Sequence, residues 1–231
     1  MNYEVSEAER DPRPYCFGFI GPGLRGITAP FLDQACSKLH IEYLREWWPS
    51  PITTHAVIKV DYLSPVGNVE AVRITANKAW KIFSPRWEGW DGPHHGYGHL
   101  HVRALGYPGP TVSAIRSFSF DMVGSPKLGD ILDLILRWRM HTFAHSLDEC
   151  GRFCGNRDFV TQVFEKLNNF EFIEEQVQGV FPPEPPVPAN MTGFDVTGLA
   201  FDHSGAHIER PIGYGQFLYF SRRDMPHMWY E

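Results

Sequence analysis

The sequence predicts an α+β fold, in which an antiparallel sheet packs against two or three helices. Three observations support this prediction. Several stretches between residues 55 and 123 alternate apolar and polar residues, as half-buried strands do. Three other stretches, one before these strands and two after them, repeat apolar residues at helical spacing. The predicted strands follow one another directly, without helices between them, and that order favours an antiparallel sheet.

The composition is that of a globular protein. The chain has 231 residues, of which 43% are hydrophobic and 21% charged, enough for one domain with a large core. A net charge of −6 argues against nucleic-acid binding, which normally needs a basic surface. No apolar run is long enough to span a membrane, and the acidic first residues do not form a signal peptide. We therefore expect a cytoplasmic protein that binds neither nucleic acid nor membrane.

Glycine and proline divide the chain into four parts. Residues 1–30 contain "GFIGPGLRGITAP" and are predicted to form an irregular N-terminal arm. Residues 31–180 hold most of the predicted elements and form the core α+β domain. Residues 181–190, "FPPEPPVPAN", are predicted to be an extended connector. Residues 191–231 contain "FDVTGLAF" and "YGQFLYF", which we expect to be strands that return to the core sheet.

The first core element is predicted to be a helix from Phe31 to Trp48, ended by Pro49 and Pro51. Its apolar residues recur at helical spacing: Phe31, Leu32, Ala35, Leu39, Tyr43 and Trp47.

The strands follow. In "HAVIKVDYL" the apolar side chains alternate with Lys59 and Asp61, which predicts a strand with one buried and one polar face. "SPVGN" is expected to turn it into a second strand from Val69 to Thr75, as a hairpin, and "WKIF" suggests a third. The strands "GYGHLHVRAL" and "IRSFSFDMV" complete the sheet. The predicted inward residues of these strands are Ala56, Ile58, Val60, Tyr62, Leu100, Val102, Ala104, Phe118, Phe120 and Met122.

Two more helices are predicted after the strands. Ser125 and Pro126 are typical of an N-cap and a first helical residue, and this helix should reach Met140. Its buried residues would be Leu128, Ile131, Leu132, Ile135 and Trp138. The last helix follows "CGRFCGN", and its buried residues would be Phe159, Val160, Val163, Phe164 and Leu167.

Histidines are concentrated in "HHGYGHLH", residues 94–101. On a strand, His99 and His101 would point to one face and could share a metal ion, but no carboxylate follows to complete such a site. We therefore expect no metal and assign His99 and His101 to acid–base catalysis or hydrogen bonding. His95, Tyr97 and Arg103 would contribute to substrate binding.

Cys150 and Cys154 precede the last predicted helix. Four cysteines in a cytosolic chain do not predict disulfides, and their spacing does not fit a structural zinc site. A helix N-terminus lowers the pKa of a nearby thiol, so either cysteine is a candidate nucleophile with His55 as its base. The alternative is that both are ordinary buried thiols.

The order of a histidine strand, further strands and a cysteine before a helix resembles the permuted papain-like superfamily of the LRAT and NlpC type. Within it, "THAVIKV" and "HTFAHSLDECGRFC" are similar to an uncharacterised fungal family linked to specialised-metabolite gene clusters. The resemblance implies a papain-like fold and a role in secondary metabolism. That family has Gly-Cys where this chain has Cys150-Gly151, a Trp where it has Cys154, and a Trp where it has Ala56.

These features lead to three hypotheses about function. The first is a cofactor-free enzyme of specialised metabolism that binds an apolar molecule and promotes its cyclisation or isomerisation with histidine assistance. Aromatic residues make up 14% of the chain, and we expect Trp80, Trp87 and Trp90 to line the pocket. No nucleotide, dinucleotide or flavin motif is present, so no cofactor is expected.

The second hypothesis is a thiol-dependent acyltransferase or hydrolase, which alkylation of cysteine would inactivate. The third is a non-enzymatic module that binds a small molecule or a protein through the loop "WEGWDGPHHGYG". In each case we expect that the chain can form a homodimer through an exposed strand edge.

Overall fold

A computed structural model describes most of the predicted core. The described residues are 27–45, 54–82, 95–138, 140, 142–147, 153–183, 186, 188, 190–202, 204–209 and 215–217. Side chains are described in these ranges except at 77–82, 95–99, 142–147, 153–154 and 215–217.

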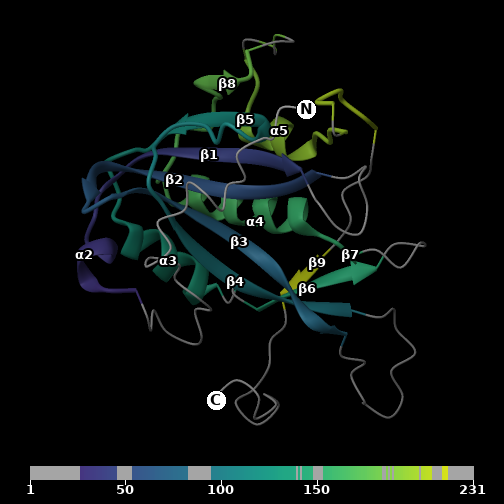
Figure 1. The fold of residues 1–231 in the computed structure, drawn as a ribbon, viewed down its shortest axis with the longest axis horizontal. Coiled ribbons are helices and arrows are strands. Elements are labelled where there is room, and N and C mark those ends of the chain that lie inside the picture. Colours follow the sequence, from purple (N-terminus) through teal and green to yellow (C-terminus); the bar gives the residue numbers. More distant parts are fainter. Residues whose placement is uncertain are drawn as a thin grey trace, which may run out of the picture.

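The described strands form one nine-stranded sheet, and neighbouring strands in it are antiparallel. Its order is β7-β6-β4-β3-β2-β1-β5-β8, and β9 also pairs with β6 (Figure 1). The strands are β1 (Cys36–Arg45), β2 (Thr54–Val66), β3 (Val69–Ile82), β4 (His95–Leu105), β5 (Ala114–Asp121), β6 (Thr142–Leu147), β7 (Phe153–Cys154), β8 (Gly179–Phe181) and β9 (Gly215–Phe217). The predicted α+β class is therefore correct.

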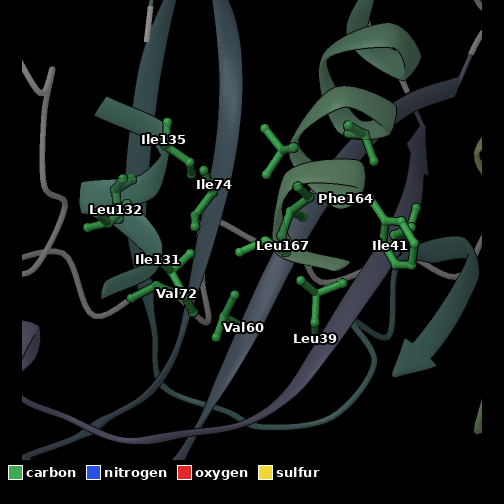
Figure 2. Close-up of a cluster of buried hydrophobic side chains, with 14 of the residues drawn as sticks. Leu39, Ile41, Val60, Val72, Ile74, Ile131, Leu132, Ile135, Phe164 and Leu167 are labelled. Carbon is green, nitrogen blue, oxygen red and sulfur yellow. The ribbon is translucent and has the colours of Figure 1, made fainter. Parts of the chain in front are cut away.

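Four helices are present in the described part of the chain: α2 (Ala29–Leu32), α3 (Leu128–Arg137), α4 (Asn156–Asn169) and α5 (Gly193–Gly198). The longer two, α3 and α4, cover one face of the sheet (Figure 1). Figure 2 shows how they meet it: Ile131 and Ile135 of α3 and Phe164 of α4 point toward apolar side chains of β1, β2 and β3. Within the described ranges, no helix is both long and apolar enough to cross a bilayer.

Most of the predicted core lies where the alternation places it. The inward residues of β2, β4 and β5 are buried, with Met122 packed at the margin of the core. All five apolar residues predicted for α4 are buried as well. Gly67, with φ of 63°, makes the turn of the β2–β3 hairpin, where Val66 pairs with Val69.

The helix predicted from Phe31 to Trp48 is wrong. Among residues 31–45, which the structure describes, only the end of α2 is helical, and β1 follows it, paired with β2 on one side and β5 on the other. The apolar residues Leu39, Ile41 and Tyr43 alternate with His40 and Glu42, which fits a strand as well as a helix. Pairing on both edges and burial of both faces favour the strand here.

Two further predictions need correction. The expected strand at 194–201 begins as helix α5, because Thr192 and Asp195 satisfy each other's backbone N–H groups in a capping box. The helix expected from Pro126 starts instead at Leu128, where Asp130 accepts the Lys127 N–H over 2.9 Å. Trp138 lies beyond α3, 42% exposed, and not in its buried stripe.

A polar face covered by a loop

The face of the sheet opposite α3 and α4 is polar and buried. Directly paired residues form a row across five strands: Ser119, His40, Lys59, Arg73 and Arg103. The next rows add Glu42 on β1 and Asp61 on β2, both less than 5% exposed. Lys59 and Asp61 were expected to face solvent, so that expectation is wrong.

The segment between β4 and β5, residues 106–113, covers this face. Gly109 binds two neighbours at once, because its carbonyl accepts from Lys59 Nζ and its N–H donates to Asp61 Oδ2 over 2.6 Å. Lys59 Nζ also lies 3.4 Å from Asp61 Oδ1 and 4.6 Å from the centre of the Tyr107 ring. We call residues 106–113 the covering loop. Its backbone supplies hydrogen bonds to charged groups that would otherwise need water.

A second contact of the covering loop is made by Thr111. Its N–H donates to Glu42 Oε1 and its hydroxyl to Glu42 Oε2, and it accepts from Arg73 Nη2 over 3.0 Å. Arg73 Nη2 lies 3.5 Å from Glu42 Oε2. Two carboxylates and two cations are therefore held on one face with their hydrogen bonds largely satisfied, as buried charges require.

Asp61, His40 and Ser119 form a continuous hydrogen-bonded chain. His40 Nε2 lies 2.8 Å from Asp61 Oδ2, and Ser119 Oγ lies 2.9 Å from His40 Nδ1. An ionised carboxylate only accepts, so a neutral His40 must carry its proton on Nε2. Its Nδ1 lone pair then faces the Ser119 hydroxyl, which donates to it. This arrangement leaves the imidazole oriented as a base.

Electrostatics keep the Asp61 carboxylate ionised. Burial alone would raise its pKa, but the hydrogen bond from His40, the Lys59 ammonium and the Gly109 N–H together hold the pKa below its ordinary value. Burial lowers the pKa of Lys59, and the neighbouring Asp61 and Glu42 oppose that shift. Perturbed ionisable groups that share one site are typical of functional centres.

His55, the predicted base, lies at the start of α4. Its Nδ1 contacts the side-chain amide of Asn156, the first residue of that helix. The N-cap of α4 is Gly155, with φ of 118° and no side-chain bond. The structure therefore brings His55 to the end of α4 that follows Cys154.

The backbone positions of the other predicted site residues are partly described. Cys154 pairs with Ser146, which pairs in turn with His95, so the three share one row of β7, β6 and β4. Tyr97 pairs with Ala144, and His99 pairs with Asn77 and Thr142.

His101 and Arg103 are half-buried and paired with Thr75 and Arg73 in β3, on the covered face. Trp80 belongs to β3, and its side chain is outside the described part. Cys150, Trp87 and Trp90 lie outside the described residues altogether. Within those residues, no three His, Cys, Asp or Glu side chains are grouped so as to bind a metal.

Sequence reasoning missed His40, Glu42, Arg73, Ser119 and Thr111. The first two fall within the mistaken helix, and Ser119 alternates with the predicted inward residues Phe118 and Phe120. A usable signal exists once the strands are known: Glu42 and Asp61 lie two residues along their strands from the row that holds Lys59 and Arg73, so unlike charges are diagonal neighbours on one face.

A scan against protein-family models, a search of curated proteins and a search of solved structures each found no match to this chain.

Proposed function

We propose that the protein is a cofactor-free enzyme of specialised metabolism that binds an apolar small molecule and promotes its cyclisation or isomerisation. His40 is the acid–base group in this proposal. The observation that supports it is the orientation of His40, which is fixed by Asp61 on one nitrogen and leaves the other nitrogen to accept a proton. A base held in this way by a third group is the usual arrangement for proton transfer in enzymes.

The proposed proton transfer follows from the charged groups around the His40 imidazole. Neutral His40 takes a proton from the substrate, directly or through the Ser119 hydroxyl, and Asp61 stabilises the imidazolium that forms. His40 then returns the proton at another substrate atom, which completes an isomerisation or a ring closure. The cations Lys59 and Arg73 favour negative charge developing on a substrate oxygen. Such proton transfer contributes about 10²–10⁴-fold in rate.

Substrate access in this proposal requires the covering loop to move. Gly109 and Thr111 occupy the hydrogen-bonding groups of Lys59, Asp61 and Glu42. A substrate carbonyl or hydroxyl that replaced them would make equivalent bonds. The aromatic share of 14% supports an apolar substrate, although Trp80, Trp87 and Trp90 have no described side chains.

The test compares metabolite extracts of the source organism with the gene intact, deleted, or carrying His40→Gln. Glutamine keeps a hydrogen-bond donor toward Asp61 but cannot act as a base. The control is His207→Gln, because His207 is an exposed histidine outside the polar face. We expect the His40→Gln extract to match the deletion and the control to match the intact strain at equal protein abundance. A His40→Gln extract identical to the intact one would refute the proposal.

A second candidate is thiol-dependent acyl transfer or hydrolysis at the start of α4. The contact of His55 with Asn156 supports it, because it places an imidazole at the positive end of a 14-residue helix directly after Cys154. A permuted papain-like arrangement, with a histidine strand beside a cysteine helix, is part of this second proposal.

Alkylation separates the two candidates. In the thiol proposal, iodoacetamide removes the activity, and so does Cys150→Ser or Cys154→Ser. In the leading proposal, the activity survives alkylation and either substitution. Cys36 is an internal control: burial raises its pKa to about 12, so it should be labelled only after unfolding. Full activity of a Cys150→Ser, Cys154→Ser double variant would reject the thiol candidate.

A further inference from the structure

We propose that Ser119 is a catalytic nucleophile that accepts a short acyl group from an ester or thioester, with His40 as its base. This inference rests on the proposed function for the role of His40, and it adds a covalent step and a substrate class to it.

The geometry supports the pairing of nucleophile and base. Ser119 Oγ lies 2.9 Å from His40 Nδ1, and Asp61 Oδ2 lies 2.8 Å from His40 Nε2. Serine hydroxyls are weak nucleophiles unless a base removes the proton as the bond forms, and such a base is itself oriented by a third group. Asp61 is in turn held by the Gly109 N–H over 2.6 Å, so each member of the chain has a fixed partner.

All three members of the chain are buried, Asp61 and His40 at 4% and 1% exposed and Ser119 at 8%. Ser119 belongs to β5, next to the terminal strand β8. Because so little of Ser119 is exposed, the proposal takes a short acyl group rather than a bulky one. Ser119 is thus the only member of this hydrogen-bonded chain placed near a sheet edge.

Gly179 leaves space beside the Ser119 hydroxyl. It pairs with Ser119 across β5 and β8. A methyl group built on Gly179 would meet only the Cβ and Oγ atoms of Ser119, both at 3.8 Å, which is ordinary contact. Apart from the two residues next to Gly179 in the chain, nothing else in the described structure lies within 4 Å of that methyl group, and the Gly179 backbone is outside the left-handed region. A carbonyl group can therefore approach Oγ over Gly179.

The reaction balances without an oxidant or a metal. Ser119 Oγ attacks the carbonyl carbon while its proton passes to His40 Nδ1, and Asp61 stabilises the imidazolium. The bond to the alcohol or thiol breaks, and that group leaves with the proton from His40. Water, or an acceptor alcohol, then gives a proton to His40 and attacks the acyl-serine ester. The acyl group departs as an acid or a new ester, and Ser119 regains its proton.

Ser117 provides a matched comparison on the same strand face. It lies two residues before Ser119 and is fully buried, and its Oγ has no hydrogen-bond partner within the described structure. Without a base it should not react.

The experiment treats the full-length chain with p-nitrophenyl acetate, follows nitrophenolate release and locates acetyl groups by peptide mass spectrometry. We expect acetylation at Ser119, with release slowed about 10²-fold or more in Ser119→Ala and in His40→Gln. Ser117→Ala should behave as the unchanged chain. Gly179→Val, which fills the approach to Oγ, should slow release about tenfold.

Unchanged release in Ser119→Ala, or acetyl groups found only on lysines or on Ser117, would overturn the proposal. If Ser119→Ala does not fold, Ser119→Cys replaces it. The new thiol should still take the acetyl group when His40 is present. It should lose that reactivity in the double variant with His40→Gln. A negative acetylation result can be distinguished from failure of the proposed function. An unacetylated Ser119 together with metabolite loss in His40→Gln rejects the nucleophile alone.

Discussion

Thr111 binds both carboxylate oxygens of Glu42, the backbone N–H donating to Oε1 and the hydroxyl to Oε2, each over 2.7 Å. This double contact fixes the covering loop to β1 and provides partners for a carboxylate that is fully buried. The polar face is therefore sealed by specific bonds, and removing any of them should be measurable.

Thr111→Val should lower the free energy of unfolding by about 1–3 kcal/mol, because valine has the same shape but leaves Glu42 Oε2 without the hydroxyl. The adjacent Val112→Thr is the control, since Val112 is 64% exposed and the change should stay within about 0.5 kcal/mol. Urea unfolding at neutral pH measures both. A Thr111→Val protein as stable as the unchanged chain would show that the hydroxyl contact is not needed.

Lys59→Met should destabilise the fold by about 3–5 kcal/mol, because it removes one partner of a buried ion pair and leaves Asp61 charged. The matched control is Lys38→Met. Lys38 pairs with Asp121 at 2.5 Å, but their side chains are 46% and 49% exposed, so this loss should be about 0–1 kcal/mol. Chemical unfolding of the two variants gives the comparison, and equal losses would contradict the burial argument.

The depressed pKa of Asp61 predicts a loss of stability in acid. Its carboxylate stabilises the fold fully above the unfolded-state pKa, near 3.9, and the stabilisation is lost as the pH falls through the lower folded-state pKa. Asp61→Asn should be less stable than the unchanged chain at about pH 6, and the difference should shrink as the pH drops below about 4. Urea midpoints across this range test it, and a constant difference would refute it.

Gly193→Ala should destabilise the packing of α5 on α4 by about 1–3 kcal/mol, because the new methyl group would lie 1.9 Å from Cζ of buried Phe164. Phe164 also packs against Phe120 and Phe194, which limits its movement. Gly198→Ala, at the other end of α5, has open space around it and is the control. Thermal unfolding should separate the two, and similar melting temperatures would contradict the account.

Much of the apolar core was predictable because β2, β4, β5 and α4 each have a single clear periodicity. Alternation identified the inward residues of β2, β4 and β5, and helical spacing identified the buried stripe of α4. At β1 the same residues satisfy both periods, with His40 and Glu42 in between. Only pairing with β2 and β5 resolves that ambiguity, and it depends on the tertiary fold.

The polar face could not be predicted in the same way. Alternating Lys59 and Asp61 indicate a solvated strand face unless something covers it. Here the cover is backbone: the partners that Gly109 offers are its own carbonyl and N–H, which every residue has. By contrast, a position for His55 near the start of α4 was part of the thiol hypothesis, and there the structure does place His55 Nδ1 against Asn156.

The most direct test of the central claim is the proton position on His40 at neutral pH, measured by long-range ¹⁵N–¹H NMR on histidine-labelled protein. If Asp61 orients His40 as a base, the proton lies on Nε2, and Nδ1 has the chemical shift of an unprotonated nitrogen that accepts from Ser119. In Asp61→Asn this preference should weaken. A proton found on Nδ1 instead would mean that His40 donates toward Ser119, and both the proposed base and the proposed nucleophile would be wrong.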